Sequence, residues 1–296
     1  MNLQRQWAAS SAERHAQRLA ALATRCLVIE ANLTPKPGLV DRRGSGAHHD
    51  LTLALMERSA HSLTPMFREM ARQSWQRPAD IALRQLAGRL GREGEAVMMQ
   101  VTGGVNTHRG AIWALGLLVS AAAMCGGRGS PTQITRMAAR LAQLPDDAAP
   151  TLFSNGLRAC SRYRLPGARE EAQQGFPHVM NLALPQLWQS RQQGANSNAA
   201  RLDALMAIMT SLSDTCVLSR AGMPGLEAMQ QGARAVLVAG GVQQPAGQQA
   251  LQRLDAAMLA LNASPGGAAD LLSATIFLDH VHCSGRGCPT PTKGWA

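Results

Sequence analysis

Apolar residues recur at helical spacing through most of this 296-residue chain, and strand-like alternation is nowhere sustained. Near the start of the chain, for example, Leu19, Leu22, Cys26 and Ile29 fall on one helical face. Ala, Leu and Met supply most of the hydrophobicity, whereas β-branched and aromatic residues are scarce. Because the former favour helices and the latter favour strands, the sequence predicts an all-α protein of about ten helices.

The helical pattern also predicts where the main segments lie. They span residues 51–70, 81–99, 105–125, 202–212, 226–238, 251–261 and 268–280. Pro65 is expected to kink or divide the first of these, since proline lacks the N–H that a helix interior requires. The segment 105–125 is apolar all round, which is typical of a central buried helix. We expect one catalytic domain over residues 1–284 and a loose tail over 285–296.

The net charge of +10 indicates an anionic partner or a strongly charged surface. Nucleic acid is the less favoured partner, because single-strand binders need stacking aromatic residues and the chain has four Phe and one Tyr. A small polyanion such as a nucleotide fits at least as well. We expect no signal peptide in the first 25 residues, because charged residues interrupt them. The longest apolar run is too short to span a bilayer, and the six scattered cysteines are typical of reduced thiols. We therefore expect a cytoplasmic protein that does not enter membranes.

Residues 34–50, TPKPGLVDRRGSGAHHD, combine turn-forming prolines and glycines with ionisable groups of both signs. Cations of this kind bind phosphate, and carboxylates or imidazoles transfer protons. The candidates for phosphate are Lys36, Arg42 and Arg43, and those for proton transfer are Asp41, His48 and Asp50. A solvated connecting loop is the alternative interpretation.

A second cluster, TGGVNTHRG at 102–110, lies just before the most apolar helix. Gly103 and Gly104 are expected at the start of that helix, where exposed N–H groups and the helix dipole favour phosphate. Further donors there are Asn106, Thr107, His108 and Arg109. Alternatively, the glycines form only a turn, and Asn106 or Thr107 caps the helix.

The remaining candidates could equally serve as helix caps. Asp214 is placed near a helix C-terminus, where it would pair with Arg220, hold a cation or lie within a longer helix. Ser264, Gly266 and Gly267 could frame another anion-binding helix start, with Asp270 further along it. Glu95 is a weaker candidate acid, and the segment with Arg169, Glu171 and residues 175–177 is expected to be a loop.

These motifs occur in an order that resembles the triphosphoribosyl-dephospho-CoA synthase family. The shared segments are TPKPGLVD at 34–41, SGAH at 45–48, GGVNTH at 103–108, DT at 214–215, SPGG at 264–267 and ADLL at 269–272. The resemblance covers residues 29–278, and DRRGSGAH at 41–48 resembles the malonate decarboxylase branch more than the citrate lyase branch. Two positions depart from the family pattern: Arg109 replaces an expected Lys, and Cys216 replaces an Asn found in many relatives.

The resemblance implies that ATP transfers its 5-triphosphoribosyl group to the ribose 2′-hydroxyl of 3′-dephospho-CoA and releases adenine. The product would pass to a holo-acyl-carrier-protein synthase. Mg²⁺ would accompany ATP, with Asp214 and Asp270 as its ligands. The catalytic groups would be Asp41, His48, Asp50, Glu95 and His108, with His48 or Asp50 as the base and Asp41 as the electrostatic partner. The substrate-binding residues would be Lys36, Arg42, Arg43, Gly103, Gly104, Asn106, Thr107, Arg109, Arg220, Ser264, Gly266 and Gly267.

Two other functions use the same features. An ATP-dependent phosphotransferase or nucleotidyltransferase acting on a CoA-like substrate would produce ADP or pyrophosphate instead of adenine. A helical nucleic-acid-binding protein would need no nucleotide substrate, and its binding would weaken steeply with salt.

Overall fold

The computed structural model describes residues 3–149 and 155–286, and every regular element within them is a helix. The predicted all-α class is therefore confirmed. In chain order the helices are α1 (Leu3–Asn32), α2 (Leu53–Ser62), α3 (Thr64–Ser74), α4 (Ile81–Val101), α5 (Arg109–Met124), α6 (Pro131–Gln143), α7 (Asn155–Tyr163), α8 (Ala168–Gln173), the π-helix η1 (His178–Ala183), α9 (Leu184–Gln192), α10 (Ser197–Met209), α11 (Thr215–Val238), α12 (Pro245–Ala260) and α13 (Gly266–Arg286).

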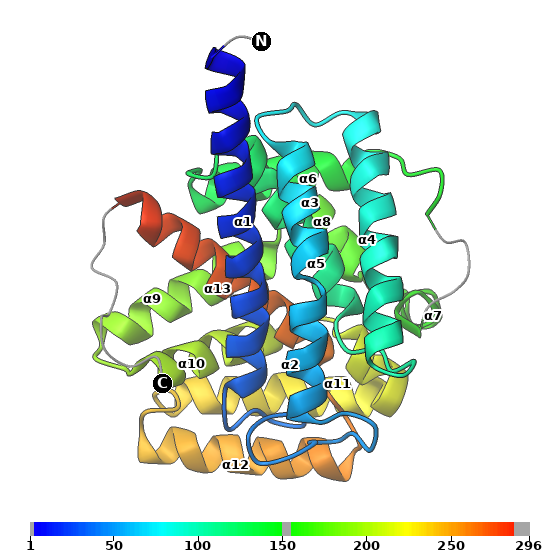
Figure 1. The fold of residues 1–296 in the computed structure, drawn as a ribbon. Helices are drawn as coiled ribbons and strands as arrows, with labels where there is room; N and C mark the ends of the chain where they lie inside the picture. Colours follow the sequence, from blue (N-terminus) through cyan, green and yellow to red (C-terminus); the bar gives the residue numbers. More distant parts are fainter. Residues whose placement is uncertain (1–2, 150–154, 287–296) are drawn as a thin grey trace.

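The helices form an upright group over a transverse pair. Figure 1 shows α1, α2–α3 and α4 standing next to one another, with α11 and α12 running across their lower ends. The loop that joins α1 to α2 reaches α12, where the backbone N–H of Gly38 donates to Asp255 Oδ1 at 3.0 Å. The candidate loop of residues 34–50 therefore lies where the upright and transverse helices meet.

Helix α5 is the centre of the fold. Thirteen of its sixteen residues are buried, and it packs against α1, α3, α4, α6 and α13. This confirms the prediction of a central apolar helix, but the predicted start at residue 105 is wrong. Gly103 and Gly104 have φ values of 66° and 90° and end α4, with the Gly104 N–H donating to Met99 O at 2.8 Å. The glycine pair is thus a C-terminal cap and not a helix start.

Pro65 divides two helices, as predicted. Helix α2 ends at Ser62 and α3 begins at Thr64, which places Pro65 in the first turn of α3. A proline is tolerated there because the first N–H groups of a helix have no intrahelical acceptor.

Helix α11 bends sharply near the candidate site, because Gly222 has φ 63° and Pro224 follows it. At the other end of the fold, α13 extends to Arg286, so the first two residues of the predicted tail are helical; residues 287–296 lie outside the described residues. None of the helices described is both long and apolar enough to cross a lipid bilayer.

Candidate active site

Two pockets adjoin each other around the N-termini of α5, α11 and α13. Their cavities measure about 750 and 760 Å³ including the openings to solvent, and Gly110 and Asp270 line both. We call the first the basic pocket, because its lining includes Lys36, His48, His108, Arg109 and Arg220. We call the second the Trp113 pocket, and its lining is described below. Pockets of this size accommodate small-molecule ligands.

Asp41 folds the loop of residues 34–50 and lines neither pocket. Its buried carboxylate accepts hydrogen bonds from Thr34 Oγ1 at 3.1 Å and from the Lys36 N–H at 2.9 Å. Arg43 adds two more, from its N–H at 2.7 Å and its Nε at 2.9 Å. This geometry does not support the expected role of Asp41 as the electrostatic partner, because its oxygens hold the loop.

Arg42 and Arg43 also lie outside the pocket lining. Arg43 Nη1 pairs with Asp255 Oδ2 at 2.6 Å, so its guanidinium joins Asp41 to helix α12. The exposed Arg42 donates from Nε to Asn32 Oδ1 at 3.2 Å. The prediction that these two cations bind phosphate in the site is not supported by the geometry, because their nearest partners are groups of the loop and of its supporting helices.

Lys36 lines the basic pocket but carries a buried counter-charge. Its Nζ is 2.5 Å from Glu30 Oε1 and 2.6 Å from Glu30 O, and both side chains are almost fully buried. A buried ion pair loses hydration on both partners, which is compensated only when the charges stay close together. Lys36 and Glu30 therefore line the pocket as an ion pair, in which the charge of Lys36 is balanced.

His48 is suitably placed to act as a base in the basic pocket. Its Nε2 is 2.8 Å from Ser264 Oγ, and its Nδ1 is 3.5 Å from Arg220 Nη1. Burial and the positive charge of Arg220 lower the pKa of His48, so its imidazole is neutral at pH 7. Asp50, the other candidate base, is exposed, with Oδ1 3.7 Å from His48 Nδ1.

Arg220 joins three segments at the mouth of this pocket. Its guanidinium donates to Asn262 O at 2.9 Å and to the carbonyl oxygen of Ala47. It therefore fixes the positions of the loop that carries His48 and of the turn that precedes α13.

His108 lines the basic pocket and has one buried ring nitrogen without a hydrogen-bond partner in the described part of the chain. Its Nδ1 is 2.8 Å from Ser59 Oγ, whereas its buried Nε2 has no partner among the described residues. Burial, aided by the charge of Lys36, lowers the pKa of His108 to about 4. A neutral imidazole with an unsatisfied buried nitrogen fits a ligand that supplies the missing hydrogen bond.

The 102–110 segment contributes to the site in a different way from that predicted. Gly103 and Gly104 are exposed and line neither pocket, whereas Asn106 and Thr107 line the basic pocket. The N-cap of α5 is His108, so the alternative that Asn106 or Thr107 caps the helix is wrong; Asn106 Oδ1 does accept from the Arg109 N–H in the first turn at 3.2 Å.

Arg109 connects the basic pocket to a neighbouring hollow. Its Nε is 2.5 Å from Glu95 Oε1, and Glu95 lines that hollow and not the basic pocket. The structure thus separates Glu95 from His48 and His108, which were expected to act with it.

Asp214 caps α11 and joins it to α13. Its Oδ1 accepts from the N–H groups of Cys216 at 2.9 Å and Val217 at 3.3 Å, and its Oδ2 accepts from the Ala268 N–H at 2.8 Å. Burial raises the pKa of Asp214 to about 6, although the backbone donors oppose this shift. The predicted position at a helix C-terminus is wrong, and with both oxygens occupied Asp214 does not fit a metal ligand.

Asp270 forms part of the wall between the pockets and fits a cation better. It accepts a hydrogen bond from the Ala111 N–H, while burial and the charges of Glu30 and Asp214 raise its pKa. A nearby cation would relieve that repulsion. Among the described residues there is no cluster of three or more His, Cys, Asp or Glu side chains that could hold a metal, but Mg²⁺ often uses one or two carboxylates with water and phosphate.

The segments around α13 complete the two linings. Ser264 and Gly266 line the basic pocket together with Cys216, and Gly267 lines the Trp113 pocket. These glycines lie at the N-terminus of a 21-residue helix, which is the arrangement predicted for them.

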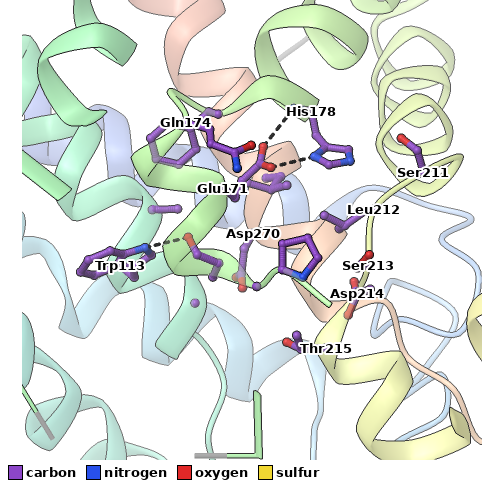
Figure 2. Close-up of a pocket in the computed structure, with 18 residues that line it drawn as sticks. Trp113, Glu171, Gln174, His178, Ser211, Leu212, Ser213, Asp214, Thr215 and Asp270 are labelled. Atoms are coloured by element: carbon purple, nitrogen blue, oxygen red, sulfur yellow. Dashed lines mark hydrogen bonds and ion pairs between the residues drawn. The ribbon is translucent and has the colours of Figure 1, made fainter. Parts of the chain in front are cut away.

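The Trp113 pocket contains a carboxylate–histidine pair that the sequence analysis missed. Glu171 accepts from the His178 N–H at 2.9 Å and lies 2.7 Å from His178 Nδ1 (Figure 2). Glu171 lies on α8 and His178 begins η1, so the predicted loop is helical on both sides of a short turn. A Glu and a His seven residues apart in the sequence do not by themselves predict a contact. The contact between these two side chains depends on the turn at Phe176, whose backbone has φ 61°.

A family model for CitG, ATP:dephospho-CoA triphosphoribosyl transferase, matches residues 16–287. The chain belongs to this family. A 2-(5″-triphosphoribosyl)-3′-dephosphocoenzyme-A synthase of Klebsiella pneumoniae is 70% identical over 270 residues, which cover 91% of this chain and 96% of that relative. A Pseudomonas fluorescens relative, named as the same synthase with the qualifier "Probable", is 58% identical over 90% of this chain and 92% of its own length.

The triphosphoribosyl transferase family assignment agrees with the fold. A crystal structure from Archaeoglobus fulgidus, named only provisionally as a triphosphoribosyl-dephospho-CoA synthase, matches with a TM-score of 0.51. It is 16% identical and covers 76% of this chain and 97% of that chain, so it supports the all-α architecture alone. Within this family member, five of the six segments that carried the resemblance contribute residues to the basic pocket, and the sixth, DT at 214–215, lines the Trp113 pocket.

Proposed function

We propose that the protein transfers the 5-triphosphoribosyl group of ATP to the ribose 2′-hydroxyl of 3′-dephospho-CoA and releases adenine. Family membership supports the synthase activity. One observation in the site supports a placement of ATP with its triphosphate in one pocket and its base in the other. The pocket lined by Lys36, Arg109 and Arg220 adjoins a second pocket whose described lining contains no Lys or Arg. A nucleotide has the same polarity, with about four negative charges at one end and a neutral base at the other.

The basic pocket can bind the triphosphate and activate the acceptor. Arg109 and Arg220 provide guanidinium groups for phosphate oxygens. His48 is neutral at pH 7 and can take the proton from the 2′-hydroxyl of dephospho-CoA as that oxygen attacks C1′ of the ATP ribose. Ser264 and Arg220, on either side of the imidazole, keep it in position.

Mg²⁺ bound with ATP would neutralise phosphate charge, and Asp270 is the protein ligand that fits it best. Asp270 lines the basic pocket near Glu30; burial and the charges of Glu30 and Asp214 raise its pKa, and a bound cation would offset that effect. Asp214 is left out of this assignment because backbone N–H groups fill both of its oxygens.

We further propose that the product serves a malonate decarboxylase acyl carrier protein and passes to a holo-acyl-carrier-protein synthase in the cytoplasm. The segment DRRGSGAH at 41–48 supports the malonate branch over citrate lyase. Among the described residues Cys26, Cys125, Cys160 and Cys216 are free thiols, which is usual for a reducing compartment. Disrupting the gene in its host should leave the malonate decarboxylase carrier without its prosthetic group; loss confined to a citrate lyase carrier would contradict this assignment.

The activity itself is tested by incubating purified protein with ATP, Mg²⁺ and dephospho-CoA and separating the products by chromatography. We expect free adenine in proportion to a heavier CoA derivative, and no adenine when dephospho-CoA is omitted. Formation of ADP, AMP or pyrophosphate without adenine would instead identify a phosphotransferase or nucleotidyltransferase.

A further inference from the structure

The Trp113 pocket has the chemistry of a site for a neutral, flat ring. Its apolar lining includes Trp113, Phe176, Leu212 and Leu271. Its ionisable lining residues, among those described, are Glu171, His178, Asp214 and Asp270, with no Lys or Arg. Three carboxylates and no fixed cation disfavour phosphate groups, whereas a purine base can pack on apolar side chains and hydrogen-bond at its edges.

His178 is held in one orientation at the edge of this pocket. Glu171 accepts from both its backbone N–H and its ring, and Figure 2 shows the second ring nitrogen directed away from Glu171. Because a carboxylate can only accept, Nδ1 carries a proton and Nε2 is the ring atom left for a ligand.

The backbone around this pair is irregular, as it often is at functional sites. His178 is the first residue of the π-helix η1, and Phe176, two residues earlier, has φ 61°. Both features are uncommon in ordinary connections and are enriched where a side chain must be aimed at a ligand. Phe176 is buried, which holds the turn in place beside Glu171.

We propose that the Trp113 pocket binds the adenine of ATP and that His178 is the general acid that protonates this adenine as it leaves. Glu171 is a positioning residue that orients the His178 ring. This inference rests on the proposed triphosphoribosyl transfer. With the triphosphate in the basic pocket, this placement sets the ribose of ATP beside Gly110 and Asp270, the two residues that line both pockets, and the bond to be broken next to them.

The departing adenine must take up one proton, and in this proposal His178 supplies it. The C1′–N9 bond breaks and its electron pair leaves with the adenine, while protonated His178 gives the proton on Nε2 to a purine ring nitrogen. The bond from C1′ to O2′ of dephospho-CoA forms, and the hydroxyl proton passes to His48. His178 then regains a proton from solvent, and His48 releases one.

The test compares two leaving groups. His178→Ala should lower kcat with ATP by about 10²–10⁴-fold, the usual contribution of a general acid. The same variant should lose less than roughly 10-fold with 7-methyl-ATP, whose cationic base leaves as a neutral purine without protonation. Glu171→Gln should show a smaller loss with the same preference for 7-methyl-ATP. His61→Gln, an exposed histidine on α2, is the matched control and should behave as wild type with both.

If Glu171 and His178 have only a structural role, their variants should lose turnover equally with ATP and with 7-methyl-ATP, and that outcome would overturn the proposal. Unchanged turnover of ATP by His178→Ala would do the same. If that variant does not fold, His178→Gln, which keeps the side-chain volume of a half-buried position, replaces it.

Product inhibition tests the occupant of the pocket in the wild-type protein. Adenine should compete with ATP, whereas competition with dephospho-CoA alone would assign the pocket to the acceptor and refute the inference. The two levels are separable: wild-type protein that releases no adenine refutes the proposed function, whereas adenine release without leaving-group selectivity refutes only this inference.

Discussion

Gly110→Ala should inactivate the enzyme while leaving it folded. A Cβ on Gly110 overlaps Asp270 Oδ2, well inside the 3.0 Å that real Cβ atoms keep from their neighbours. The Asp270 carboxylate must therefore move by about 1 Å, and a misplacement of that size in an active site can cost about 10²-fold in rate. Because the overlap is with the end of a side chain and not with backbone, the shift should cost little stability.

Alanine also has a higher helix propensity than glycine, by up to about 1 kcal/mol, so the variant should not lose helical stability at this position of α5. The assay measures the kcat of adenine release with ATP and dephospho-CoA, together with thermal unfolding. We expect kcat to fall about 10²-fold, with a Tm within a few degrees of wild type.

Gly91→Ala is the matched control for this experiment. Gly91 is also helical, but a Cβ there meets its nearest atom, Met70 Cε, at 3.6 Å, which is ordinary van der Waals contact. This variant should keep wild-type kcat. Full activity of Gly110→Ala would show that the position of Asp270 is not important and would refute the placement of the reaction at the shared wall.

Three further predictions concern individual groups. Asp214→Ala should lower Tm by roughly 3–7 °C without any ligand present, because it removes a helix cap and leaves the N–H of Ala268 unpaired, about 2–4 kcal/mol together; an unchanged Tm would contradict the capping role. Burial and the charge of Arg220 lower the pKa of His48 from 6.5, so kcat/KM should fall at acid pH with a midpoint below pH 6.5. Arg220→Gln should move that midpoint to higher pH. A midpoint that does not move would exclude His48 as the base. Lys36→Met should lower the free energy of unfolding by about 3–5 kcal/mol, because the buried charge of Glu30 loses its partner. In chemical denaturation, the double variant Lys36→Met/Glu30→Gln should lose less stability than the sum of the losses of the two single variants.

The helices could largely be predicted because their signal is local. Regular apolar spacing and Pro65 act through near neighbours in the chain, and the structure confirms the division at Pro65 and the buried central helix. The start of α5 could not be predicted in the same way. A glycine pair marks an interruption, but whether Gly103 and Gly104 end one helix or begin the next depends on which carbonyl groups their N–H groups reach.

The site was predicted by residue type and only partly by position. His48, His108 and Arg220 do meet in the basic pocket, although they come from three distant segments. Asp41 and Arg43 are also ionisable residues of the kind expected in a phosphate site, but they support the loop instead of lining the pocket. Arg43 does so because it pairs with Asp255, which is 212 residues away in the sequence. No local pattern carries that information.

The central claim is tested most directly with ATP labelled both in the adenine ring and in the γ-phosphate. After reaction with dephospho-CoA, we predict that the adenine label appears as free base and the γ-phosphate label appears on the CoA derivative, one to one. Transfer of the γ-label to orthophosphate or pyrophosphate, or retention of the adenine label in a nucleotide, would contradict triphosphoribosyl transfer.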